Sequence, residues 1–503
     1  MSTLSKLARG SALRITETLV AIATGFIMLP LMIHYLGESL YGLWIIIGGF
    51  VASLYLFDFG FSASVTRYAA RAISRSDHHD ANVTINTGIL VYSLLGLIIL
   101  AATVIIIFFT PSIMDDQSQV PLAQTLVLLS GLNIAIGFPF KAFTGIPDAY
   151  LRYDLLSLVR VVIKILSTAA LILALYLGYQ LIAVAIIGLI TSLVFDFVYY
   201  WIARYLYPPL KLSPSLISRE RLKELSSYSA WAFIIDINRL ARQKADIFVI
   251  GAFLGTSLLT IYYVSSRLAD YAIQLLNRAT NMATPIYIEQ LTNQKFQEAK
   301  DTLFLFLRIH FILGFAMFLC FIVGGDLLIR LWMGNSFDYG LSYAILLSMF
   351  MGRTVTFSFM PFQSMMMAAG THKYLAYLNI VETAISVSAM IIVVKVFDLG
   401  LLAIALSGAI PAICLRIFFL PSLVKQILDV TRWEIIKALS YFALCFLVST
   451  SIGLGVKTIL TWPDWAEMLI ATGLALAVLF GLVFPGLSSK EKGYARRILR
   501  RGK

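Results

Sequence analysis

Basic side chains lie inside stretches of this chain that are otherwise apolar. Arg160 and Lys164 are four residues apart, so they share one face of a helix. Like charges on one face repel each other, and an arginine or lysine at the centre of a membrane helix costs about 2.5 to 3.5 kcal/mol. Such side chains are therefore expected to line a hydrated cavity that accepts an anion. The residues assigned to this cavity are Arg267, Arg160, Lys164, Arg353, Arg239 and Arg242.

Neighbouring carboxylates leave a second interpretation open for part of this set. Structural ion pairs at helical spacing explain the following residues equally well: Asp236 with Arg239, Arg242 with Asp246, and Arg267 with Asp270. The apolar stretch around Arg160 and Lys164 contains no carboxylate of its own. These two residues therefore favour the anion cavity more strongly than the others do.

A different polar set occupies one face of a later apolar helix. Asn379, Glu382, Thr383 and Ser386 follow helical spacing. Carboxylate, amide and hydroxyl oxygens are the ligands that a hard cation such as Na⁺ prefers, and a buried carboxylate equally suits a proton relay. A cluster of hydrogen bonds between helices explains the same spacing, so both interpretations stay open on the residues alone.

The composition is that of a protein embedded in a membrane. Of the 503 residues, 59% are hydrophobic and only 13% are charged, whereas about a quarter are charged in soluble domains. Apolar stretches of about 20 residues, the length that crosses a bilayer, recur from the first residues to position 485. We expect about fourteen transmembrane helices in an all-α polytopic protein. Three scattered cysteines, Cys320, Cys414 and Cys445, follow no metal-binding spacing.

The charge of the loops predicts how the chain is oriented. Lysines and arginines gather in alternate short loops, on the same side as the N-terminus and the basic C-terminal tail. By the positive-inside rule, both termini are predicted to be cytoplasmic. The net charge of +12 follows largely from this bias, so it requires no nucleic acid. The basic tail is expected to lie on anionic lipids.

One short motif occurs twice, nearly half the chain apart. Residues 34–44 read HYLGESLYGLW and residues 252–262 read AFLGTSLLTIY. In each, a glycine suits the left-handed position after a helix and the next serine suits a helix cap. A tight turn between any two helices explains the motif alone, but the spacing of six helices favours two parallel-related six-helix lobes with a site between them. The predicted parts are an N-terminal lobe (1–204), a cytoplasmic linker (205–226), a C-terminal lobe (227–420), two extra helices (421–485) and a basic cytoplasmic tail (486–503).

Longer stretches resemble a known family. They are KLARGSALRITETLVAIATGFIMLPLMIHYLGESLYGLW, LFDFGFSASVTRYAAR and KADIFVIGAFLGTSLLTIYYVSSRL. They resemble the polysaccharide flippases of the multidrug/oligosaccharidyl-lipid/polysaccharide exporter superfamily, which include the flippases of O-antigen and exopolysaccharide repeat units. The likeness runs through the whole chain, although its motifs are degenerate.

The resemblance implies a transporter rather than an enzyme, without catalytic residues or a cofactor. Two lobes would open alternately to either side of the bacterial cytoplasmic membrane. They would carry an oligosaccharide linked to a polyprenyl diphosphate from the inner to the outer leaflet, with other polysaccharide assembly proteins as partners. Na⁺, H⁺ or the membrane potential would drive transport, and the potential contributes about 2.3 kcal/mol per charge per 100 mV.

Residue roles carry over from the lipid II flippases of the same superfamily. There, an arginine about twenty residues after an aspartate helps to bind the diphosphate, and this pattern matches Arg267 after Asp246. The same aspartate contributes to a sodium site, to which Asp246, Asn379 and Thr383 correspond by position, and Glu382 joins them by spacing. Arginines of the first two helices have no full counterpart here. The resemblance therefore implies that Arg160, Lys164 or Arg353 takes over part of the anion binding.

Three rival functions are compatible with a membrane protein of this kind. A cation-coupled drug exporter of the same fold should have an apolar or acidic cavity, which the deep basic residues argue against. A membrane polysaccharide polymerase or ligase typically has a large outward loop with catalytic residues, whereas the predicted loops are short. A scaffold of an export complex is the third. The sequence has no GxxxxGK[ST] loop, so this chain is not expected to contain an ATP-driven motor.

Overall fold

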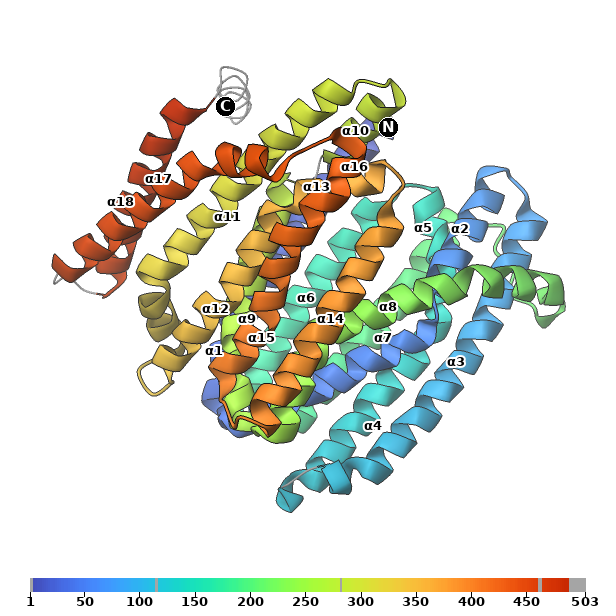
Figure 1. Cartoon of the computed structure of the whole chain (residues 1–503). Coiled ribbons are helices and arrows are strands. Elements are labelled where there is room, and N and C mark those ends of the chain that lie inside the picture. Colours follow the sequence, from blue (N-terminus) through green and yellow to red (C-terminus); the bar gives the residue numbers. More distant parts are fainter. Residues whose placement is uncertain (1–2, 114–115, 281–282, 460–463, 488–503) are drawn as a thin grey trace. The chain divides into compact units, whose positions relative to one another are not determined.

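The chain is helical throughout the part that this computed structural model describes, residues 3–113, 116–280, 283–459 and 464–487 (Figure 1). Among these residues, eleven segments are long and apolar enough to cross a membrane. The chain is therefore a multi-pass membrane protein, and the predicted all-α polytopic fold class is confirmed.

The predicted number of about fourteen spans is not confirmed. Helix α1 (Thr3–Leu54) contains two of the predicted spans in one element, which has a kink at Gly37. Helices α8 (Arg219–Phe253) and α9 (Thr256–Thr280) are long enough to cross a bilayer but are not among the eleven apolar segments. Both helices contain the charged residues that drew attention in the sequence.

The chain divides into two compact units, residues Met1–Thr260 and Ile261–Lys503, with the boundary inside α9. They are called unit 1 and unit 2 below. The five parts predicted from the sequence stay a prediction. The further elements of unit 1 are η1 (Tyr55–Asp58), α2 (Phe61–Ser74), α3 (His78–Ile113), η2 (Gln117–Gln119), α4 (Val120–Gly137), η3 (Phe138–Phe143), α5 (Gly145–Ala149), α6 (Tyr153–Tyr176), α7 (Leu181–Leu206) and η4 (Pro214–Leu216).

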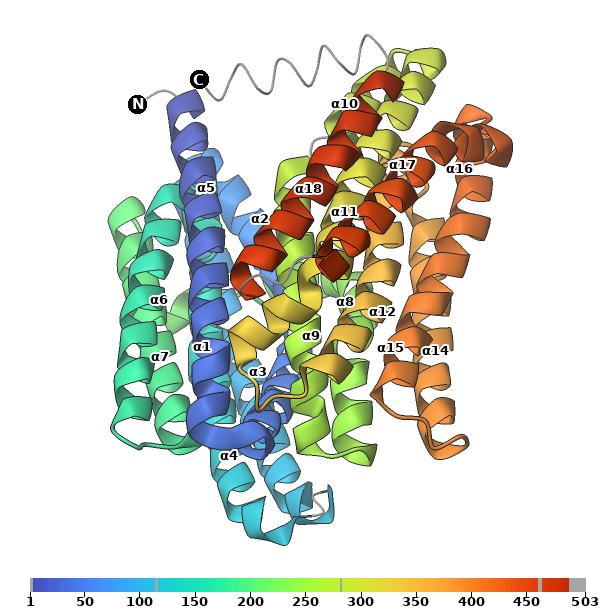
Figure 2. The same ribbon diagram turned by 90° about the vertical axis from the view of Figure 1, so that its left-hand side faces the viewer.

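Small residues allow the helices of unit 1 to pack closely. Helix α3 lies against α4, and α1 lies along α6 (Figures 1 and 2). A Cβ atom at Gly96 of α3 would lie only 2.7 Å from the carbonyl oxygen of Ala135 on α4. Close backbone approach at small residues is the usual way in which membrane helices gain contact, because lipid provides no hydrophobic force between them.

Unit 2 is built around α11. Its elements after α9 are α10 (Ala283–Thr292), α11 (Phe296–Met333), α12 (Tyr339–Ser358), α13 (Met360–Ala368), α14 (His372–Lys395), α15 (Leu401–Cys414), the π-helix η5 (Leu415–Phe419), α16 (Leu420–Leu428), α17 (Arg432–Ile459) and α18 (Asp464–Gly486). Helices α17 and α18 run beside α11 (Figure 2). Ion pairs hold α17 to both halves of α11, Lys300 with Glu434 at 2.9 Å and Asp326 with Lys457 at 2.5 Å.

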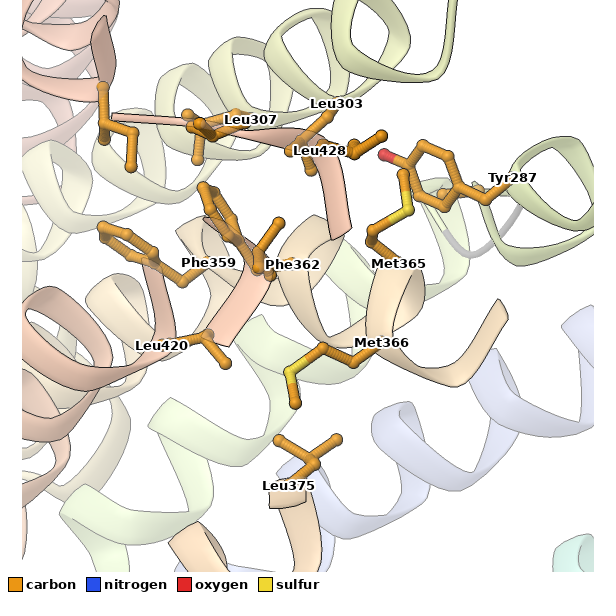
Figure 3. Close-up of a cluster of buried hydrophobic side chains, with 14 of the residues drawn as sticks. Tyr287, Leu303, Leu307, Phe359, Phe362, Met365, Met366, Leu375, Leu420 and Leu428 are labelled. Carbon is orange, nitrogen blue, oxygen red and sulfur yellow. The ribbon is translucent and has the colours of Figure 1, made fainter. Parts of the chain in front are cut away.

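A buried apolar cluster holds the short helices of unit 2 together (Figure 3). Phe362 of α13, Leu420 of α16 and Leu303 of α11 are completely buried in it. Helices of nine or ten residues, such as α10, α13 and α16, are marginal by themselves in length. This cluster therefore fixes the segment on either side of the π-helix η5.

The repeated motif forms two turns that contact each other within unit 1. Gly37 and Gly255 have φ values of 79° and 88°, so both have the positive φ that glycine favours, but the ψ of 165° places Gly37 outside the predicted left-handed helical region. The Ser39 hydroxyl lies 3.2 Å from the Thr256 hydroxyl, and Thr260 donates a hydrogen bond of 2.7 Å to the carbonyl oxygen of Glu38. The two copies are thus packed face to face.

Candidate functional site

Two helices of unit 1 break where their charged residues lie. Helix α1 gives way to η1 and to Phe59 and Gly60, which have φ values of 47° and 78° before α2 begins. Helix α4 gives way to η3, which interrupts the candidate span Gln117–Ala149. Broken backbone at membrane depth is tolerated only inside protein or along a hydrated cavity, and such breaks mark binding sites in transporters.

An ion pair joins the two breaks. The Lys141 ammonium of η3 lies 2.8 Å from a carboxylate oxygen of Asp58 in η1, and the other oxygen of Asp58 accepts the Ser62 backbone N–H. The ammonium also lies 4.2 Å from the Phe138 ring centre and 5.0 Å from that of Tyr55. Cation–π contacts of this kind add to the ion pair.

A second carboxylate and an open aromatic ring complete this group. Asp196 of α7 packs against Gly137, where a Cβ atom would lie 2.7 Å from its Oδ2. Gly137 lies four residues before Lys141 in the chain, next to the start of η3. Tyr55 is 50% exposed. We call Tyr55, Asp58, Lys141 and Asp196 the unit 1 polar break. It offers an ammonium donor, carboxylate acceptors and a ring face side by side.

Sequence reasoning missed Lys141 and Asp196. A signal for Lys141 was present, because Pro139 and Pro147 flank it within one apolar stretch, and a proline breaks the helical hydrogen-bond pattern. Asp196 stands alone between two phenylalanines, and nothing in its spacing indicates a partner.

Arg160 has a partner that lies far away in sequence. Its guanidinium lies 3.4 Å from Glu17 of α1, which also accepts a 2.7 Å hydrogen bond from Ser157. The Arg160 side chain is 48% exposed. Lys164 lies one turn further along α6 and is also exposed. The two like charges thus stand on an accessible face of α6, and Glu17 compensates the first of them.

Helix α8 contains the third predicted group of unit 1. Arg242 is exposed, and a carboxylate oxygen of Asp246 accepts the backbone N–H of Ile247 at 2.9 Å. The side chains of Arg239 and Asp236 lie outside the described residues.

Two of the predicted arginines meet along one face of α9 in unit 2. The Arg353 guanidinium of α12 lies 2.5 Å from Asp270 and 3.2 Å from the Ser266 hydroxyl. Arg267 bonds the Tyr263 hydroxyl through Nε at 2.6 Å. Tyr263, Arg267 and Asp270 recur at helical spacing, so both guanidinium groups lie on this face. The ion pair of Asp270 is therefore with Arg353 rather than with the nearer residue in sequence, Arg267.

The polar set of α14 surrounds an arginine that sequence reasoning missed. Arg416 of η5 is completely buried. Its Nη2 lies 2.8 Å from Glu382 Oε2 and 3.0 Å from Asn379 Oδ1. The Thr383 hydroxyl donates to the carbonyl oxygen of Asn379 at 2.8 Å. An arginine in the stretch ICLRIFF was the available signal, because a charge amid apolar residues at membrane depth requires a partner.

These residues do not fit the sodium ion that the family resemblance implied for them. A sodium ion needs several oxygen ligands around it, and a guanidinium already bonds one oxygen each of Asn379 and Glu382. Asp246, the remaining residue of that prediction, belongs to unit 1, and its part in a cation site stays a prediction.

Comparisons with known proteins identify the family and the fold. A family model described as "Polysaccharide biosynthesis protein" matches residues 34–341, which confirms the resemblance drawn from the sequence. A search of curated proteins finds no match.

Solved structures with this fold come from one superfamily of transporters. The lipid II flippase MurJ in an inward closed conformation has a TM-score of 0.71 at 15% identity, over 94% of this chain and 97% of its own. An inward-facing multidrug resistance MATE transporter has a TM-score of 0.65 at 16% identity, over 83% and 98%. A MOP superfamily transporter from Pyrococcus furiosus has a TM-score of 0.59 at 16% identity, over 85% and 96%. At these identities the likeness shows the fold.

Proposed function

The chain belongs to the polysaccharide biosynthesis protein family, and we propose that it flips polyprenyl-diphosphate-linked oligosaccharide repeat units from the inner to the outer leaflet of the bacterial cytoplasmic membrane. It acts as a transporter without a catalytic site. The polymers that such units build are O-antigen or exopolysaccharide. The N-terminus and the C-terminus are cytoplasmic in this proposal.

The arginine pair on the α9 face carries the proposal. Arg267 and Arg353 present two guanidinium groups, and the Arg353 and Asp270 side chains remain 28% and 40% exposed. With Asp270 as the one carboxylate in this group, its net charge is +1 and favours an anion. The planar guanidinium group of arginine can donate two hydrogen bonds to the oxygens of one phosphate group. The arginine pair is therefore suited to bind a diphosphate.

The unit 1 polar break has the chemistry of a saccharide site within unit 1. With Asp58, Lys141 and Asp196, its formal charge is −1, so it does not favour the diphosphate. Lys141 donates hydrogen bonds and both carboxylates accept them, which matches the hydroxyl groups of a sugar. The half-exposed Tyr55 ring adds an apolar face. Arg160, Lys164 and Arg242 are further exposed basic side chains of unit 1, and Glu17 compensates the charge of Arg160.

No chemical step is needed for this function. A diphosphate and its sugars do not cross hydrocarbon unaided, because charged and hydroxyl groups lose their water there. Polar groups of the protein replace that water, while the prenyl chain stays in lipid. In a cell that is negative inside, the membrane potential favours the outward movement of an anion.

Reconstituted vesicles test the proposal directly. Purified protein is placed in vesicles that contain a polyprenyl-diphosphate-linked oligosaccharide, and an impermeant glycosidase measures the fraction exposed on the outside. The proposal predicts that the protected fraction becomes accessible with the protein and stays protected in empty vesicles. An equal rate of exposure in both preparations would contradict it.

A further inference from the structure

Arg416 is the largest fully buried side chain among the described residues, with an exposed fraction of 0%. A charge removed from water in this way persists only beside an opposite charge and with hydrogen bonds. Glu382, which is 5% exposed, supplies the opposite charge, and Asn379 supplies an amide oxygen. The three side chains thus lie together in a buried polar group inside unit 2.

The local backbone places Arg416 at this point. Helix α15 contains Pro411 and continues as the π-helix Leu415–Phe419, in which one extra residue per turn changes the direction of the side chains. Leu415 and Leu420, on either side of Arg416, are buried in the apolar cluster, and Figure 3 shows Leu420 there. Leu378, the neighbour of Asn379, belongs to the same cluster. Packing therefore fixes both sides of the group.

The arginine lies among the oxygens that would ligate a coupling ion. Asn379 and Glu382 are three residues apart on α14. Nη2 of Arg416 donates a hydrogen bond to Asn379 and forms an ion pair with Glu382. A free cation on these two oxygens would stand beside a guanidinium at contact distance. Repulsion between two such charges is strong in an interior that excludes water.

We propose that Arg416 is a built-in cation that takes the place of a free cation at Glu382 and Asn379. Unit 2 then binds no Na⁺ at this group, and its charge stays balanced without a coupling ion. The proposal concerns Asn379, Glu382 and Thr383 and is independent of the substrate. The driving force for transport is consequently supplied elsewhere.

Removal of the arginine should create a cation site. Arg416→Ala leaves the Glu382 carboxylate, the Asn379 amide oxygen and the Thr383 hydroxyl around an empty space, which together are suitable ligands for Na⁺. The thermal unfolding midpoint of the purified full-length protein is compared in sodium chloride and in N-methyl-D-glucamine chloride at equal ionic strength. Sodium should raise the midpoint of Arg416→Ala, because an ion that binds only the folded state stabilises it. Arg416→Ala/Glu382→Gln should lose this response.

Three further variants keep the test decisive. Arg416→Lys retains a tethered charge and should not acquire the sodium response. Lys437→Ala removes an exposed basic residue of the same unit and controls for the change in net charge. Should Arg416→Ala not fold, Arg416→Gln fills most of the space, adds a carbonyl oxygen as a ligand and should show the same sodium response.

Two results would overturn the proposal. In the first, sodium raises the midpoint of the wild type and Glu382→Gln abolishes that increase. In the second, both neutral variants at position 416 respond to sodium no more than Lys437→Ala does. Because the measurement uses no lipid-linked sugar, its outcome is separate from that of the flippase proposal.

Discussion

The guanidinium of Arg353 on α12 lies 2.5 Å from the carboxylate of Asp270 on α9. The same guanidinium reaches the Ser266 hydroxyl at 3.2 Å, so α9 orients it by two side chains. Arg267, three residues before Asp270, is turned back onto Tyr263. Unit 2 therefore presents two oriented arginines. The Asp270 carboxylate forms its ion pair with only one of them, Arg353.

Arg353→Ala should weaken substrate binding by about tenfold to a hundredfold, because a charge-assisted hydrogen bond contributes about 1.5 to 3 kcal/mol. Titration of the purified protein with a polyprenyl-diphosphate-linked sugar measures this change. Arg353→Lys should fall between the wild type and Arg353→Ala, because lysine provides the charge without the planar fork. Equal affinity of Arg353→Ala and the control Lys437→Ala would exclude Arg353 from the site.

Lys141→Met should destabilise the protein by about 1 to 3 kcal/mol, less than the roughly 3 to 5 kcal/mol for a completely buried pair. The loss of stability should be smaller than for a completely buried pair because the Lys141 and Asp58 side chains remain 25% and 15% exposed. Asp58→Asn/Lys141→Met removes both charges and should be less destabilised than the single variant. Unfolding followed by circular dichroism provides the comparison. If the double variant is the less stable of the two, the ion pair is not what holds the two breaks together.

Gly42→Ala should disrupt the contact between the repeated turns. A Cβ atom there would clash with the carbonyl oxygen of Thr256, whereas a Cβ at Gly48 of the same helix meets no atom within 4 Å. Gly48→Ala should therefore be neutral or stabilising by about 0.5 to 1 kcal/mol. Parallel melting curves of the two variants test this, and equal midpoints would show that the close approach is absent.

Gly37→Ala should destabilise the turn by about 1 to 3 kcal/mol. Gly37 combines a φ of 79° with a ψ of 165°, a region that is essentially restricted to glycine. Steric crowding plays no part, since no atom lies within 4 Å of a Cβ built there. The unfolding midpoint again serves as the readout. A variant as stable as Gly48→Ala would mean that the backbone relaxes without penalty.

The class of fold could be predicted from the sequence because each apolar stretch identifies a membrane helix by itself. The same local logic identified Gly37 and Gly255, whose conformation depends on neighbours in the chain. The predicted number of spans is not confirmed, because the charged helices α8 and α9 are long enough to span but do not have the composition of an ordinary span.

Partners across the fold could not be predicted in the same way. Glu17 compensates Arg160 from a distance of 143 residues, and Arg416 reaches Glu382 from a different helix. Helical spacing shows which residues share a face, but it says nothing about the helix that packs against that face. The residues of the polar set on α14 were thus identified correctly as neighbours, while the cation at their centre was not.

The most direct test of the central claim is the location of polyprenyl-diphosphate-linked repeat units in cells that lack this protein. The account predicts that they accumulate in the inner leaflet, and that wild type and Lys437→Ala relieve the accumulation while Arg267→Ala/Arg353→Ala does not. Normal delivery to the outer leaflet in cells without the protein would contradict a flippase function.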